Sequence, residues 1–138
     1  MSVERRLAYS GRTFRIAFAR DRGGAYPAEE FFDTLTKSDQ EKLMYLFSLL
    51  CDQGKHSNPQ KFGDLGDGLY EFKSFQIRMP FAYAENERGL ILITHGFLKK
   101  RDKAPPSEIV RARRILKEDA QASNVIEITD QNKKRKRP

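Results

Sequence analysis

Hydrophobic periodicity along the chain switches from strand-like to helix-like and back. Residues 13–18 alternate apolar and polar side chains, which predicts a β-strand with one buried face. Pro27 suits the first turn of a helix, and the acidic residues that follow it suit the positive end of that helix. The capping-box pattern at residues 38–41 predicts a second helix, whose apolar positions recur at helical spacing until a stop at Gly54.

The second half of the chain returns to strand patterns. Residues 69–73 and 76–83 are predicted to form two strands, and residues 90–93 form an almost continuous apolar run, typical of a central strand covered on both faces. Pro80 donates no ladder hydrogen bond, so the second of these strands is expected to have an edge or a bulge there. A last helix is predicted to begin at Pro105.

This order of elements predicts the α+β class. We expect a small single domain, in which an N-terminal strand and two helices pack on a twisted antiparallel sheet of three to five strands, with a C-terminal helix. The length of 138 residues leaves room for one core. The domain is expected to span residues 1–119, because clear periodicity is lost beyond Asp119. Residues 120–138 are expected to form a basic, disordered tail.

The positive charge of the chain is unevenly distributed. The net charge is +7, and five of these charges lie within residues 133–137, so that residues 1–132 carry only +2. Residues 27–53 hold six acids and two lysines, whereas residues 99–118 hold eight bases and three acids. A cationic surface at one end suits a polyanionic ligand, although a solvated helix with a charged loop explains it equally well.

Several classes of protein are disfavoured by the sequence. No run approaches the roughly 18 apolar residues that span a bilayer, and no apolar core of a signal peptide follows Met1, so we expect a cytoplasmic protein with no membrane partner. Cys51 lies on an apolar helical pattern and is expected to be a buried small hydrophobe. With one cysteine and two histidines we expect neither a disulfide framework nor a zinc site, and no cofactor.

The strands in the second half each carry a cationic or titratable side chain. Pairing of these strands would bring four of them within reach of one another: Lys73, Arg78, His95 and Lys99. Cations and a proton carrier can cleave RNA without metal, by promoting attack of the 2′-OH on the adjacent phosphate. We therefore predict a catalytic set and a phosphate-binding set, the first Lys73, Arg78 and His95, the second Lys61, Lys99, Lys100, Arg101 and Lys103.

Each catalytic candidate also has a structural interpretation. Arg78 is the candidate phosphate clamp, because its guanidinium matches two phosphoryl oxygens, and the nearness of Lys73 and Lys99 favours this role over an arginine on a solvated strand face. Lys73 could be a second clamp or a base, or it could pair with a glutamate across the sheet. His95 has the ordinary pKa for acid–base work near neutrality, yet it shares the parity of buried positions and could be a packed histidine.

Three motifs in this region resemble a known family. The run at residues 68–73, Arg78, and the segment at residues 95–100 with Lys103 and Pro105 resemble the phage-derived, HigB-like branch of the RelE/ParE toxin superfamily. The likeness extends over residues 13–117, and the lysine-rich segment is its most specific part. Lys73 stands where many relatives carry arginine, and residues from Ala120 onward have no counterpart.

The resemblance implies both a fold and a function. It implies two helices packed on a small antiparallel sheet, in the toxin of a type II toxin–antitoxin pair. Such a toxin is a ribosome-associated mRNA endoribonuclease that inhibits translation. The implied partners are mRNA, the ribosome and a small helix-turn-helix antitoxin.

Two other functional classes stay open from sequence. A protein of the same fold could bind and block a target such as a topoisomerase without catalysis. A basic accessory protein could use residues 133–138 to hold nucleic acid. Grouping of Lys73, Arg78 and Lys99 favours the nuclease, because a pure binder would not need them together.

Overall fold

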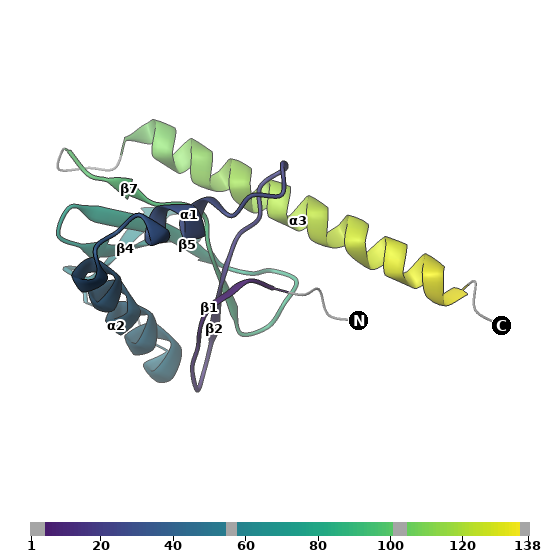
Figure 1. Cartoon of the computed structure of the whole chain (residues 1–138), viewed down its shortest axis with the longest axis horizontal. Helices are drawn as coiled ribbons and strands as arrows, with labels where there is room; N and C mark the ends of the chain where they lie inside the picture. Colours follow the sequence, from purple (N-terminus) through teal and green to yellow (C-terminus); the bar gives the residue numbers. More distant parts are fainter. Residues whose placement is uncertain (1–4, 55–57, 101–104, 136–138) are drawn as a thin grey trace.

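A computed structural model describes residues 5–54, 58–100 and 105–135, and it describes side chains as far as residue 122. Within these residues the chain forms three helices and seven strands (Figure 1). In chain order they are β1 (Leu7–Ser10), β2 (Arg15–Phe18), α1 (Pro27–Asp33), α2 (Lys37–Gln53), β3 (Phe62–Gly66), β4 (Leu69–Ser74), β5 (Ile77–Tyr83), β6 (Leu90–Ile93), β7 (Phe97–Leu98) and α3 (Pro106–Arg135).

All the strands belong to one sheet. The order is β1-β2-β6-β5-β4-β3, and β7 pairs with β5 next to the end of β6. The pairs are antiparallel except for β2 and β6, which run parallel. Along β5 the partner changes from β7 at Arg78 to β6 at Phe81, and the expected irregularity at Pro80 falls in the gap between them.

Helices cover both faces of the sheet. On one face α1 and α2 enclose an aromatic core, in which Phe72 lies 4.3 Å from Phe81 and 4.9 Å from Phe47 between ring centroids. On the other face Ile115 of α3 packs against a smaller cluster that includes Leu90 and Leu92. Figure 1 shows α2 and α3 on opposite sides of the sheet. The central strands therefore point side chains alternately into two separate cores, one on each face of the sheet.

The ends of α2 test the capping prediction. The N-cap is Thr36, whose hydroxyl accepts a hydrogen bond from Asp39 N at 3.2 Å. The box expected at residues 38–41 is therefore wrong by two residues, because both segments offer a hydroxyl ahead of an acid. The stop at Gly54 is confirmed: its φ of 69° is left-handed, and its N–H donates to Leu50 O at 2.8 Å.

The α+β architecture expected from sequence is confirmed, with two additions. The sheet also contains β1, β3 and β7, so it has more than the expected three to five strands. In addition, the β2–β6 pair is parallel, whereas an antiparallel sheet was expected. The last helix runs to Arg135, past the expected limit at Asp119 and through most of the segment expected to be disordered. Residues 136–138 lie outside the described part of the chain.

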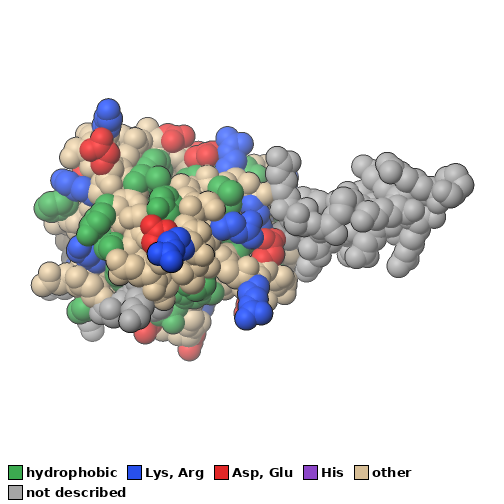
Figure 2. Space-filling view, turned by 90° about the horizontal axis from the view of Figure 1, so that it is seen from below, with side chains coloured by type: hydrophobic (Ala, Val, Ile, Leu, Met, Phe, Trp, Pro, Cys, Tyr) green, Lys and Arg blue, Asp and Glu red, His purple; other side chains and the backbone are tan. Residues whose placement is uncertain are grey.

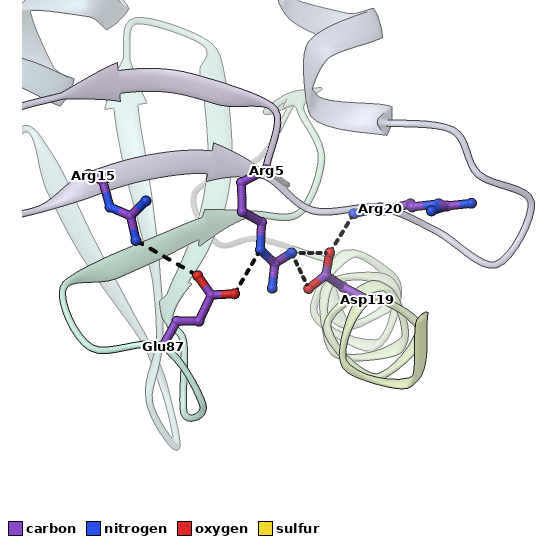
Figure 3. Close-up of polar contacts among 5 residues, drawn as sticks. All are labelled: Arg5, Arg15, Arg20, Glu87 and Asp119. Atoms are coloured by element: carbon purple, nitrogen blue, oxygen red, sulfur yellow. Dashed lines mark hydrogen bonds and ion pairs between the residues drawn. The ribbon is translucent and has the colours of Figure 1, made fainter. Parts of the chain in front are cut away.

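A cluster of ion pairs ties the N-terminal segment to α3 (Figure 3). The guanidinium of Arg5 donates two hydrogen bonds to the buried carboxylate of Asp119, at 2.8 and 2.9 Å, and a third to Glu87 at 3.3 Å. Arg20 N also donates to Asp119 at 2.9 Å, and Arg15 lies 3.8 Å from Glu87. The buried charge of Asp119 is thus fully paired, as burial of a carboxylate requires.

Candidate functional site

One face of the β4–β5–β7 ribbon gathers charged side chains. Cross-strand register places Lys73 opposite Arg78, and Arg78 opposite Phe97. Strand alternation adds Glu71 to the same face, and Lys99 follows in phase beyond β7, where its N–H donates to Gln76 O at 2.6 Å. We call this set the charged face: Glu71, Lys73, Arg78 and Lys99. It is turned away from the aromatic core under α2.

Glu71 lies at the centre of the charged face. Its side chain is only 6% exposed, and its Oε1 is buried with no hydrogen-bond partner. Burial raises the pKa of Glu71 above the ordinary value, against the opposing effect of the positive charges of Arg78, Lys73 and Lys99. A carboxylate with one oxygen that accepts no hydrogen bond, beside three cations, can accept a proton from a bound hydroxyl group.

Gly63 on β3 makes room for this carboxylate. It pairs with Glu71 in the β3–β4 register, and a Cβ at this position would lie 2.8 Å from Glu71 Oε2 and 2.8 Å from Lys73 Cε. No other residue type leaves that space. The glycine therefore lets the two side chains lie flat across the neighbouring strand.

Lys73 is held at the edge of the charged face. Its Nζ donates a hydrogen bond to Pro59 O at 2.9 Å, and its backbone N–H donates to Lys61 O at 2.8 Å. The side chain is half-buried, so its ammonium group lies beside Glu71 while part of it remains open to solvent.

Arg78 does not occupy the open position that the sequence suggested. It is only 8% exposed, and its Nη1 donates to Phe75 O at 2.6 Å and to Ile77 O at 2.9 Å. The expected solvated strand face is therefore wrong for Arg78, because the tight β4–β5 turn directs two carbonyl groups back onto the guanidinium. The positive charge of Arg78 acts on Glu71, but its Nη1 is already hydrogen-bonded to backbone carbonyl groups.

His95 is enclosed between the sheet and α3. It is fully buried, its Nδ1 lies 2.9 Å from Thr94 Oγ1, and its ring stacks on Phe97 at 5.7 Å. Nε2 lies 3.4 Å from Glu108 Oε1 without hydrogen-bond geometry. Burial lowers the pKa of His95 to about 4, and the positive charges of two arginines on α3 act in the same direction. A neutral, enclosed ring fits the interpretation of His95 as a packed histidine better than a role as a proton carrier in contact with RNA.

Burial of His95 makes folding stability sensitive to pH. The unfolded chain binds a proton at this residue near pH 6.5, whereas the folded chain does so only near pH 4, so stability falls as the pH drops through this window. We expect wild type to lose about 2 kcal/mol more between pH 6.5 and 5 than the His95→Gln variant. Urea unfolding at the two pH values measures the difference.

The raised pKa of Glu71 acts in the opposite direction on the same titration. It is common to wild type and the His95→Gln variant, so it cancels when the two are compared. Equal pH slopes for the two proteins would contradict the assignment of a neutral His95.

The predicted phosphate-binding residues are dispersed. Lys99 belongs to the charged face and Lys100 is exposed after it. Lys61 lies beyond Lys73, with its Nζ 4.9 Å from the ring centroid of Tyr45. Arg101 and Lys103 lie outside the described residues.

Sequence reasoning missed Glu71, although a signal was present. An acid two residues before Lys73 shares its strand face, and Arg78 faces that strand from the next one. The acid therefore had to lie among cations. Among the described residues no group of three or more His, Cys, Asp or Glu side chains could hold a metal ion, and no helix there has the length and hydropathy for a membrane crossing.

Comparison with known proteins places the chain in a family. A family model described as phage derived protein Gp49-like (DUF891) matches residues 30–117, which is more than half of the chain. The chain belongs to the phage-derived Gp49-like family. This family is related to the toxins of toxin–antitoxin systems. No curated protein sequence matches the chain. The Gp49-like region runs from α1 into α3 and contains the whole charged face.

Proposed function

We propose that this Gp49-like chain is the toxin of a type II toxin–antitoxin pair, of the HigB-like RelE/ParE type, and that it cleaves mRNA in association with the ribosome. The observation that carries the proposal is the buried carboxylate of Glu71, whose Oε1 has no hydrogen-bond partner, beside three cations. Such an arrangement is costly for stability and useful for proton transfer next to a phosphate. Membership of the Gp49-like family supports the toxin class.

The chemistry begins with removal of the 2′-OH proton by Glu71. In its ionised form the carboxylate accepts this proton, and the 2′ oxygen attacks the adjacent phosphorus to form a 2′,3′-cyclic phosphate. A raised pKa strengthens Glu71 as a base. The 5′ oxygen leaves as the P–O bond breaks, and it needs a proton.

The cations of the charged face balance the charge that develops on the phosphoryl oxygens. Lys73 and Lys99 are the members whose side chains are only half-buried, so they are the donors for the phosphoryl oxygens and for the departing 5′ oxygen. Arg78 contributes its positive charge from a buried position, because its guanidinium is hydrogen-bonded to the carbonyl groups of Phe75 and Ile77. We assign it a positioning role, and no step needs His95.

Growth of an expressing strain tests the proposed function. We expect expression of the chain alone to arrest growth and to cut transcripts within translated regions, since translation brings mRNA to a ribosome-associated nuclease. Co-expression of a helix-turn-helix protein encoded next to it should restore growth. Colony counts and mapping of RNA 5′ ends measure these effects. Unimpaired growth at a good yield of folded wild-type protein would refute the proposal that the chain is a toxin.

A further inference from the structure

The connection between β4 and β5 displays an aromatic ring in a strained position. Phe75 and Gln76 form a two-residue turn between Ser74 and Ile77, and Phe75 has a φ of 54°. Glycine and asparagine are the usual residues at positive φ in such turns, because a bulky side chain is strained there. Phe75 is also 76% exposed, so the ring gains little burial in return. Strain at an exposed side chain is typical of sites that contact another molecule.

Phe75 borders a groove with a cavity of about 550 Å³ between α2 and the edge of the sheet. A second exposed aromatic residue, Tyr45 on α2, lines the same groove and is 54% exposed. Lys42 Nζ lies 4.5 Å from the ring centroid of Phe75, and Lys61 Nζ lies 4.9 Å from that of Tyr45. Lys73 of the charged face is also part of the lining.

The chemistry of the groove favours nucleic acid. Three lysines and one acid, Glu41, line it among the described residues, so its charge complements a phosphate backbone. Exposed aromatic rings beside cations are the means by which proteins hold single strands, since every base has a face that can stack. A lysine that lies over an aromatic ring can also turn to a neighbouring phosphate, which then takes the place of the ring as the partner of the ammonium group.

We propose that this groove holds one unpaired base of single-stranded RNA next to the cleaved phosphate, with the base stacked on Phe75. Lys73 links the two places, because it lines the groove and lies beside Glu71. The inference rests on the proposed function for the position of the scissile phosphate. Tyr45 closes the other side of the groove, and Lys42 and Lys61 neutralise the flanking phosphates.

Binding of a non-cleavable RNA tests the stacking. The probe is a labelled single-stranded RNA, 2′-O-methylated throughout, followed by fluorescence anisotropy with wild type and Phe75 variants. We expect Phe75→Ala to weaken binding about 5- to 100-fold and Phe75→Trp to retain it, because stacking on one aromatic ring is worth that much. A set of probes with one abasic position each should lower wild-type affinity most at a single position. At that position Phe75→Ala should bind no worse than wild type.

Two controls separate stacking from misfolding. Val110→Ala removes another exposed apolar side chain, on α3, and should leave RNA affinity unchanged. Phe75→Gly relieves the positive φ and should not lower the melting temperature, while it weakens RNA binding as Phe75→Ala does.

The outcomes distinguish this inference from the proposed function. Equal RNA affinity of wild type and Phe75→Ala overturns the stacking site, as does a wild type that does not bind the probe. Loss of antitoxin binding with unchanged RNA affinity overturns it too, and makes the groove a protein-docking surface. Phe75-dependent binding of RNA in a protein that cuts no transcript supports the base site and refutes the nuclease.

Discussion

Substitution of Glu71 by Gln should reduce mRNA cleavage by about two to four orders of magnitude while the chain stays folded, because a positioned general base contributes that much to rate. The amide keeps the shape of the side chain above Gly63 but cannot accept the 2′-OH proton. It also removes a buried negative charge, one oxygen of which has no hydrogen-bond partner, so we expect the melting temperature to fall by no more than a few degrees. Cleavage of a defined mRNA on purified ribosomes, beside a thermal melt, measures both effects.

The pH dependence of cleavage gives a second readout for Glu71. Wild-type activity should rise with pH as the carboxyl group ionises, with an apparent pKa above the ordinary 4.5, and the variant should lack this limb. Glu85→Gln, an exposed acid in the β5–β6 turn, is the matched control and should cleave normally. A Glu71→Gln variant that cuts like wild type would remove the base from the mechanism.

Substitution of Asp119 by Ala should destabilise the fold by about 3–5 kcal/mol, because it leaves the buried end of Arg5 without its partner and removes an acceptor from Arg20 N (Figure 3). For a chain of this size the loss corresponds to a melting temperature on the order of 10 °C lower. Circular dichroism melts measure the change. Cleavage at temperatures where the variant is still folded should be near normal, since Asp119 is not part of the charged face.

Arg15→Ala is the control within the same cluster. Arg15 reaches Glu87 at 3.8 Å from a half-exposed position, and such surface pairs contribute little. We expect a change within about 0.5 kcal/mol. If Asp119→Ala were as stable as Arg15→Ala, the cluster would be incidental to folding.

The face of the molecule drawn in Figure 2 offers little guidance to function. Figure 2 shows apolar, basic and acidic side chains intermixed over the face seen from below. The basic side chains drawn in colour therefore do not form one patch on that face. The candidate site is defined by the charged face, whose side chains the strand register brings together.

Local patterns in the sequence predicted the elements that local interactions determine. The apolar periodicity of α2, the stop at Gly54 and the alternation in β4 and β5 follow from neighbours in sequence. β3 was missed because its sequence contains two glycines and an aspartate, which disfavour strands unless a partner provides the ladder. β1 and β7 are short, and their pairing is a property of the assembled sheet.

Only part of the site could be predicted from the sequence, and the burial of its side chains could not. Strand parity correctly placed Lys73 next to Arg78, since this needs only the hairpin register. The burial of Arg78 depends on where the carbonyl groups of Phe75 and Ile77 point, which no local pattern specifies. His95 shared the parity of buried positions, but its enclosure depends on how α3 packs on the sheet. Glu71 was overlooked because an acid between bases has the composition of an ordinary surface ion pair.

The way the two ends of the chain meet sets an order for folding during synthesis. The β3–β4–β5 meander joins segments close in sequence and can form early, whereas β2 cannot gain its parallel partner until β6 has been made. The contact between Arg5 and Asp119 spans 114 positions and must form last. We therefore expect a nascent chain to acquire its charged ribbon before its N-terminal strands are secured. A premature stop ahead of α3 would then release a product that lacks the Arg5–Asp119 contact, and we expect proteases to remove that product readily.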